Sequence, residues 1–125
     1  LRIPIQNKNP RFEVSREDCN TLLAYVRICV KAAMERVTVP SLLNPSQTLL
    51  VKKATFVTLR TEGDLRGCIG QLDAIDPLWK SARDMSIAAA CKDYRFPPLT
   101  PEDPFQIEIS IYDRRQSKTN NFYYP

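Results

Sequence analysis

The sequence predicts an α+β fold, with a mainly antiparallel sheet flanked by helices. Two observations support this. Runs of apolar residues at helical spacing occur in mixed order with runs of β-branched and aromatic residues, and two of the β-rich runs adjoin through a short turn. The chain has 125 residues, of which 43% are hydrophobic and 26% are charged. These values are ordinary for one globular domain with its own core.

The first helix is expected from Arg16 to about Val37. Ser15, followed three residues later by Asp18, has the pattern of a capping box, in which the hydroxyl and the carboxylate satisfy free amide groups at a helix start. Apolar residues then recur at helical spacing and form one face: Leu22, Leu23, Val26, Val30, Ala33 and Val37. A loop from Thr38 to about Lys53 is expected to follow.

A hairpin is expected next. Ala54–Thr61 is rich in β-branched and aromatic residues, Glu62–Asp64 carries a Gly-Asp turn signal, and Leu65–Leu72 returns as the second strand. A third strand is predicted for Gln106–Asp113, because three isoleucines alternate there with polar residues.

The second helix is predicted from Pro77 to about Lys92, with Asp76 as its N-cap and proline at its first position. Its buried side is expected to consist of Leu78, Ala82, Met85 and Ala89. A single helical turn is expected at Thr100–Asp103. Arg114–Pro125 shows no clear pattern.

Composition excludes several kinds of site. The chain contains no histidine, which rules out a Cys-His or Ser-His pair from these residues and weakens any zinc site, so no metal is predicted. Four widely spaced cysteines without a CxxC pair indicate reduced thiols and a cytoplasmic protein. No apolar run approaches the roughly 20 residues that span a bilayer. The net charge of +4 is scattered, which argues against nucleic-acid binding.

The segment Leu65–Gly70 concentrates unusual residues, since it holds two of the three glycines on either side of a cysteine. In an extended strand, Arg66, Cys68 and Gly70 share one face, and Leu65, Gly67 and Ile69 share the other. An arginine beside a thiol favours the thiolate, and glycine leaves backbone open to a ligand. Cys68 and Arg66 are therefore candidate catalytic residues, with Gly67 and Gly70 as candidate substrate contacts.

A structural interpretation of the same segment stays open. A cysteine in a strand is commonly a small buried apolar residue, and strand glycines often mark a bulge or a tight contact. The loop after the second helix offers further candidates for substrate binding: Asp93, Arg95 and Phe96. The carboxylate and guanidinium of this loop would equally serve to cap the helix end and hold the loop.

Several segments together resemble the AMMECR1 family. The residues that carry the resemblance are LRGCIG at Leu65–Gly70, with Phe56–Leu59, Pro77–Leu78, Ala89–Ala90, the D-x-R-F-P-P run at Asp93–Pro98 and Ile109–Ile111. The resemblance implies a sheet flanked by helices in which the signature segment lines a cleft. On it, residues 15–113 form the domain core, 1–14 an N-terminal extension, and 114–125 a tail or a remnant of the family's C-terminal region.

The resemblance implies two functional hypotheses. The first is an enzyme or enzyme-accessory protein whose cleft holds a small molecule or modified substrate, working with Memo-like and radical S-adenosylmethionine proteins. The second is a non-catalytic regulatory or binding module for a protein or nucleic-acid partner. Neither names a cofactor. The family order further implies that the loop at Asp93–Pro98 packs near the signature strand, with Arg95 or Phe96 in contact with Arg66–Gly70. The glycines and Arg66 predict that Cys68 is the most reactive thiol, at the floor of a pocket.

Overall fold

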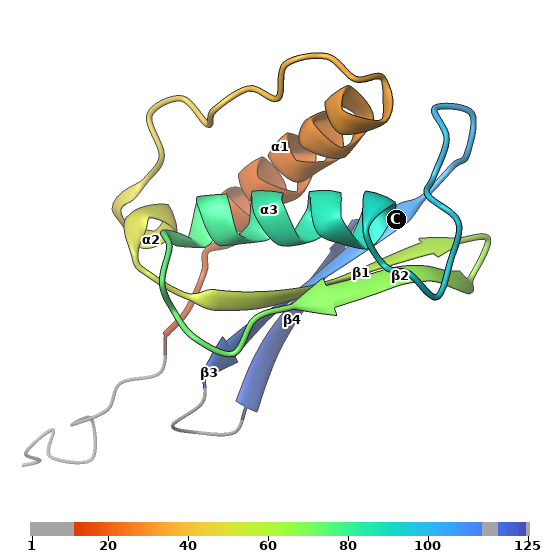
Figure 1. Ribbon diagram of the computed structural model, residues 1–125. Helices are drawn as coiled ribbons and strands as arrows, with labels where there is room; N and C mark the ends of the chain where they lie inside the picture. The colour runs from red at the N-terminus through yellow and green to blue at the C-terminus, as the bar shows by residue number, and fades with distance from the viewer. Residues whose placement is uncertain (1–11, 114–117, 125) are drawn as a thin grey trace, which may run out of the picture.

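The structure is a computed structural model that describes residues 12–113 and 118–124. Its elements are α1 (Arg16–Met34), α2 (Gln47–Leu50), β1 (Ala54–Thr61), β2 (Asp64–Gly70), α3 (Leu78–Cys91), β3 (Gln106–Asp113) and β4 (Lys118–Tyr124). The strands form one antiparallel sheet in the order β2-β1-β3-β4. The two long helices lie on the same side of it (Figure 1). The α+β prediction is confirmed. In the described part of the chain, no helix combines the length and hydropathy that crossing a bilayer requires.

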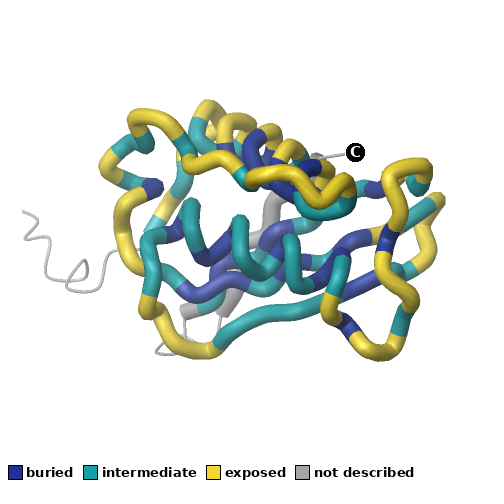
Figure 2. Tube along the Cα trace, turned by 45° about the horizontal axis from the view of Figure 1, so that its top comes forward, coloured by how far each residue is buried: buried dark blue, intermediate teal, exposed yellow. Residues whose placement is uncertain are grey.

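The core lies between this sheet and the helices, on what we call the helix face. Thr55, Val57 and Leu59 of β1 are buried there, and their register partners on β3 are the three isoleucines predicted to point inward. Figure 2 shows the buried segments gathered where helices and central strands face one another. The alternate residues of β1, Phe56 and Thr58, lie on the opposite side, which we call the open face. They are only partly buried, and no described helix packs on that face.

Helix α1 starts as predicted and ends earlier. The Ser15 hydroxyl accepts a hydrogen bond from the Asp18 amide at 3.0 Å. The carboxylate of Asp18 does not complete a capping box, because it accepts a hydrogen bond from the Ser46 hydroxyl instead. The helix ends at Met34 rather than near Val37. Arg36 adopts φ 58°, and the amide of Val37 bonds back to the Ala32 carbonyl, which is a Schellman motif without glycine.

The expected loop between Thr38 and Lys53 contains one helical turn, α2. Its N-cap is Ser46, whose hydroxyl accepts a hydrogen bond from the Leu49 amide at 3.3 Å. The same hydroxyl donates to Asp18 at 3.0 Å, so the starts of α1 and α2 are joined. A four-residue helix is too short to produce the periodic pattern that identifies helices in a sequence.

The start of α3 differs from the prediction, because Pro77 is the N-cap and the Asp76 side chain does not cap the helix. The Asp76 carboxylate forms an ion pair with Lys80 at 3.5 Å. The first helical amide, that of Leu78, donates instead to the Val51 carbonyl at 2.8 Å. The Val51 carbonyl therefore satisfies a helix N-terminal amide that a capping side chain was expected to satisfy. The buried side is also different in part, since Met85 is only half-buried.

The predicted hairpin is confirmed, with one irregularity that changes its faces. Strand β2 begins at Asp64 and ends at Gly70, short of the predicted Leu72. Leu59 pairs with Gly67 while Arg60 pairs with Leu65, so Arg66 is an extra residue in a β-bulge. Since paired residues project from the same face, Leu65 does not share the face of Gly67 as strict alternation predicted. Gly67 faces α3, and Leu65 pairs on the side of Arg60 and the open face.

The C-terminal segment joins the sheet, which corrects the expectation that residues beyond Asp113 have no clear structure. Strand β4 pairs with β3 along its length, from Asp113 opposite Lys118 to Ile107 opposite Tyr124. Its sequence, KTNNFYY, has no apolar alternation. The pairing with β3 is a tertiary contact that a period-two pattern does not reveal.

The turn of the hairpin gives a stability prediction. Glu62 and Gly63 both have positive φ, at 51° and 86°, as in a type I′ turn. Asparagine tolerates the first position better than glutamate, so Glu62→Asn should stabilise the protein by about 0.5–1 kcal/mol in urea unfolding. Glu62→Gln removes the same charge without the backbone preference and should leave stability unchanged. Equal effects of the two substitutions would contradict this explanation.

Candidate functional site

The candidate site is built on the backbone of Cys68, at the outer edge of the sheet. Strand β2 is an edge strand, so its outward N–H and C=O groups have no strand partner. The Cys68 amide donates to Asp93 Oδ2 at 2.9 Å, and the Cys68 carbonyl accepts from Arg95 Nη2 at 3.4 Å. The predicted contact between the loop and the segment Arg66–Gly70 is therefore confirmed. We call this pair of side chains the Asp93–Arg95 clamp.

The clamp is held together by its own ion pair. Arg95 Nη2 donates to Asp93 Oδ2 at 2.7 Å, and Arg95 Nε donates to Asp93 Oδ1 at 3.0 Å. Asp93 is buried, whereas the Arg95 side chain is 49% exposed. The hydrogen bonds from Arg95, followed by the one from the Cys68 amide, hold the pKa of Asp93 well below its usual range. The carboxylate is thus ionised and bidentate, the stronger type of hydrogen-bonded pair.

Arg66 belongs to a second contact between the loop and β2. Its Nη2 lies 3.5 Å from Asp103 Oδ2, and this carboxylate also accepts from the Thr100 amide at 2.9 Å. Those hydrogen bonds, the Thr100 amide first, lower the pKa of Asp103. The expected single helical turn at Thr100–Asp103 is a hydrogen-bonded turn closed by its own aspartate. Of the two arginines, Arg95 rather than Arg66 is hydrogen-bonded to Cys68.

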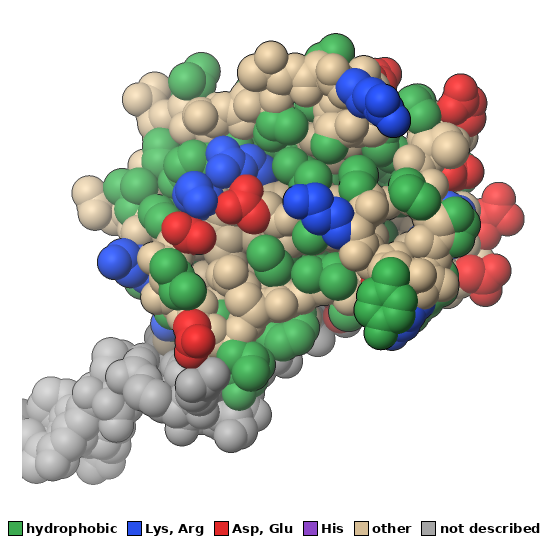
Figure 3. Space-filling view, viewed as in Figure 1, with side chains coloured by type: hydrophobic (Ala, Val, Ile, Leu, Met, Phe, Trp, Pro, Cys, Tyr) green, Lys and Arg blue, Asp and Glu red, His purple; other side chains and the backbone are tan. Residues whose placement is uncertain are grey.

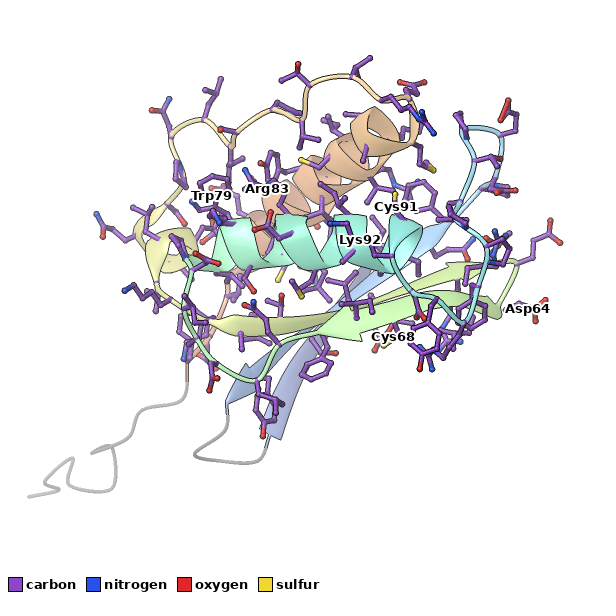
Figure 4. The ribbon with its side chains drawn as sticks, in the orientation of Figure 1. Asp64, Cys68, Trp79, Arg83, Cys91 and Lys92 are labelled. Carbon is purple, nitrogen blue, oxygen red and sulfur yellow. The ribbon has the colours of Figure 1, made fainter. Side chains whose placement is uncertain are left out.

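The side chain of Cys68 projects onto the open face. Cys68 lies opposite Thr58 in the register, and its Sγ is 3.3 Å from Thr58 Oγ1. Because both polar backbone groups of Cys68 point outward, the pair is of the non-hydrogen-bonded kind, which brings side chains close together. Figure 4 places Cys68 below β2, on the side away from α3 and Cys91. The thiol is partly buried.

The space beside each of the two glycines is filled by another part of the protein. A Cβ atom on Gly67 would overlap the carbonyl oxygen of Ala89, so the backbone of α3 sits directly on β2. A Cβ atom on Gly70 would overlap the ring of Phe56 from the adjacent strand. The expectation that these glycines leave bare backbone beside a ligand is wrong at both positions. They are small because a helix and an aromatic ring must come close.

The remaining sequence candidates lie around the clamp. Phe96 is half-buried; its amide donates to the Asp93 carbonyl at 3.0 Å, and its ring lies 5.4 Å from the Arg95 guanidinium carbon. The structure therefore brings Cys68, Asp93 and Arg95 into direct contact. Phe96 joins them through the loop, and Arg66 lies at the neighbouring bulge.

Sequence reasoning missed two residues of this site, Thr58 and Asp103. Thr58 carries a signal in the sequence, because its even position in β1 places it on the face opposite the buried residues. No sequence signal indicates the register that pairs Thr58 with Cys68. The sequence predicts only a local turn at Asp103. Its contact with Arg66 joins this turn to β2, and no local pattern indicates it. Within the described residues, no three cysteine, aspartate or glutamate side chains are grouped to hold a metal.

The surface charge is mixed rather than gathered. On the face shown in Figure 3, basic and acidic side chains lie side by side over α3. They include Lys80, which pairs with Asp76 and Asp84, and Arg83, which pairs with Asp84 at 2.9 Å. Arg83 also lies over the Trp79 ring at 5.2 Å, one helical turn away. This is the composition of a solvated helix surface.

The contact between α3 and β2 predicts an asymmetry between the two glycines. Gly67→Ala should lower the free energy of unfolding by about 3 kcal/mol, because the Ala89 carbonyl cannot move without α3. Gly70→Ala should cost less, about 1–2 kcal/mol, because the Phe56 ring can rotate. Adding Phe56→Leu should recover part of the Gly70→Ala loss and none of the Gly67→Ala loss. Urea denaturation checks these values, and a neutral Gly67→Ala would refute the close contact.

The clamp predicts how acid affects stability. The pKa of Asp93 is lower in the folded protein than its ordinary 3.8. Its stabilising contribution is therefore complete above that value and is lost as pH falls toward the lower folded pKa. Asp93→Asn should reduce the melting temperature by several degrees at pH 5–7. The difference from wild type should shrink below about pH 3.8.

The control for this prediction is Asp64→Asn, which removes an exposed carboxylate at the start of β2. Its melting temperature should follow wild type across the same pH range. An Asp93→Asn variant with the melting temperature of wild type at pH 7 would show that the clamp adds nothing to stability.

Comparison with a solved structure supports the same arrangement of elements. The crystal structure of the uncharacterized protein PH0010 from Pyrococcus horikoshii aligns with a TM-score of 0.70 and 27% sequence identity. The alignment covers 78% of this chain and 52% of that chain. The match agrees with the α+β fold described above.

Sequence relatives come from archaea and bacteria. A protein of Methanocaldococcus jannaschii is 47% identical over 64 residues, which is 48% of this chain and 32% of that protein. A protein of Thermofilum pendens is 34% identical over 112 residues, 78% of this chain and 52% of that protein. The chain thus spans between a third and a half of the length of these relatives. The AMMECR1 family profile matches residues 23–116, more than half of the chain. The chain belongs to the AMMECR1 family.

Proposed function

We propose that Cys68 is the reactive or substrate-contacting thiol of an enzyme or enzyme-accessory protein that acts on a small molecule or a modified substrate. The observation that carries the proposal is the way this residue is held. Its N–H and C=O groups are bonded to side chains 25 and 27 residues further along the chain, while its sulfur meets the Thr58 hydroxyl on the open face. Such positioning of a nucleophile by fixed neighbours is what covalent chemistry needs.

The other three cysteines support this by contrast. Cys19 and Cys29 lie in α1 and Cys91 lies in α3. Burial raises the pKa of each of these thiols, so each is less ionised at neutral pH than an ordinary cysteine. Cys68 lies instead on the open face, with the guanidinium of Arg95 at its carbonyl.

The roles proposed for neighbouring residues follow from their contacts. Arg95 is half-exposed and fixed by Asp93, so it can orient a substrate without losing its own place. Arg66 stays a candidate for favouring the thiolate from the adjacent bulge, although its guanidinium is engaged by Asp103. Phe96 provides an apolar wall beside Arg95. Gly67 and Gly70 shape the strand and are left out of the proposed substrate contacts.

The wider setting of the proposal rests on the family. The chain spans about a third to about half of the length of these relatives, so the activity of the whole protein is part of this proposal. The association with Memo-like and radical S-adenosylmethionine proteins makes a substrate-modification pathway the natural place for such a thiol. A reduced, reactive cysteine also requires a reducing compartment, so the proposal places the protein in the cytoplasm.

A non-catalytic binding module is the alternative, and one observation favours it. Tyr94 lies between the two clamp residues and is 96% exposed. Tyrosine and arginine are among the residue types that contribute most of the binding energy at protein interfaces. On this alternative, the clamp would hold Tyr94 and Arg95 out toward a partner, and Cys68 would serve packing alone.

Site-resolved alkylation separates these functions. At pH 7, iodoacetamide should label Cys68 about fivefold faster than Cys19, Cys29 or Cys91, measured by peptide mass spectrometry on the native protein. The three helical thiols should gain reactivity only as pH rises above the ordinary value of 9.0, because burial raises the pKa of each. Cys68→Ser should abolish the fast phase.

Two further variants define the result. Arg66→Gln should slow the labelling of Cys68 if its guanidinium favours the thiolate. Tyr94→Ala should leave the rate unchanged. Labelling of Cys68 no faster than that of the helical cysteines, or only after unfolding, would remove the thiol from the proposal and leave the binding module.

A further inference from the structure

A carboxylate lies in the same row as the thiol across the open face. Thr58 of β1 pairs with Cys68 of β2 on one side and with Glu108 of β3 on the other. Paired residues of antiparallel strands project from the same face, with Cβ atoms about 4.5–5.5 Å apart. The row therefore reads carboxylate, hydroxyl, thiol across three neighbouring strands. Glu108 is half-buried, and no sequence pattern associates it with Cys68.

Glu108 is a carboxylate that no described neighbour compensates, unlike the two aspartates beside Cys68. Arg66 is paired with Asp103, and Arg95 is paired with Asp93. Each of these pairs is neutral overall. For Glu108, no ion pair or hydrogen bond is formed with any side chain that the structure describes.

Arg60, a basic residue on the same face, is directed toward the hairpin turn and not toward Glu108. Arg60 is the neighbour of Glu108 in the adjoining row, since it pairs with Gln106. Its guanidinium reaches the Gly63 carbonyl at the hairpin turn, at 3.5 Å, and the side chain is exposed. Among the described side chains, the row of Cys68, Thr58 and Glu108 therefore carries one charge, the carboxylate of Glu108.

We propose that Glu108 receives a positively charged group, an amine or a guanidinium, on the substrate of the Cys68 site. The inference rests on the proposed function and adds a substrate class to it. Glu108 and Cys68 are two strand spacings apart, roughly 10 Å between backbones. A substrate that spans the row would place its cation over β3 and its electrophilic atom at the sulfur over β2.

The adjoining row favours the same chemistry. Phe56 lies on the open face one row away and Tyr112 two rows away, with ring centroids 5.9 Å apart in an edge-to-face contact. Aromatic faces attract cations, and a carboxylate beside an aromatic pair is a recurrent receptor for an ammonium group. An anionic substrate would gain nothing from this row and would be repelled by Glu108.

Charged thiol reagents test the inference without knowledge of the substrate. The probes are two methanethiosulfonates, one carrying a trimethylammonium group and one carrying a sulfonate. In each case the Cys68 thiolate attacks the sulfenyl sulfur, a mixed disulfide forms, and methanesulfinate leaves with the bonding electron pair. The rate at Cys68 is measured by peptide mass spectrometry at low ionic strength. The quantity of interest is the ratio of the cationic to the anionic rate.

Glu108→Gln should lower this ratio about two- to fivefold, because it removes the unpaired carboxylate that favours the cation. Glu108→Asp keeps the charge and should keep the ratio. Glu35→Gln, at the end of α1 on the helix side, is the matched control and should leave the ratio unchanged. In the wild type, raising the salt concentration from about 0.02 M to 0.5 M should lower the ratio, as expected for screened charges. This salt series decides the matter if Glu108→Gln does not fold.

The outcomes separate the two proposals. If neutral iodoacetamide fails to label Cys68 selectively, the proposed function fails, and this inference falls with it. If Cys68 is labelled selectively but the ratio is the same in wild type and Glu108→Gln, the thiol site stands and the cationic substrate class is overturned. A ratio in wild type that does not respond to salt would overturn it in the same way.

Discussion

The arrangement around β2 depends on satisfying the outer edge of that strand at Cys68. An edge strand presents N–H and C=O groups that need partners, and a buried amide without one is costly. The Asp93 carboxylate meets this need, and Arg95 completes it. The loop after α3 must then run along the edge of the sheet. The position of the loop, the protection of the strand and the setting of the thiol follow from one carboxylate.

A second constraint fixes how closely the helix layer approaches. The backbone of α3 touches β2 at Gly67, where any side chain would overlap the Ala89 carbonyl. The same helix is tied to β1 by a buried hydrogen bond between Thr55 and Ser81 at 2.8 Å. These contacts hold α3 over the hairpin, and the end of α3 delivers Asp93 to the edge. Because the helix is so close, the helix face offers no room for a ligand at Gly67, and the chemistry we propose for Cys68 is confined to the open face.

The charges of the region divide into structural and available groups. Two aspartates neutralise the two arginines that flank Cys68, and both pairs connect the loop to the strand. Both arginines that the sequence offered as candidate site residues are therefore engaged in ion pairs within the fold. Glu108, an ordinary polar position in an alternating strand, is the carboxylate that we propose meets a cationic group on the substrate. That proposal depends on its register with Cys68, two strands away.

How much could be predicted is clearest from particular elements. Ser15 marks the start of α1, and the alternation of Gln106–Asp113 identifies β3, because capping and periodicity are local properties. The hairpin was equally readable from its two β-rich runs and its turn. Resemblance to a family added the expectation that the loop at Asp93–Pro98 meets β2, and the hydrogen bonds of Asp93 and Arg95 confirm it.

The sequence by itself thus determined the two long helices, the hairpin and the third strand, but neither α2 nor β4. The tertiary structure decided the register and the close contacts between these elements. It placed Arg66 in a bulge, closed Gly67 and Gly70 with Ala89 and Phe56, and added β4 to the sheet. It also aligned Glu108 with Cys68. The physical reason is that helix caps and strand periods arise from bonds within a few residues, whereas register, bulges and close packing arise between segments whose sequence separation carries no local signal.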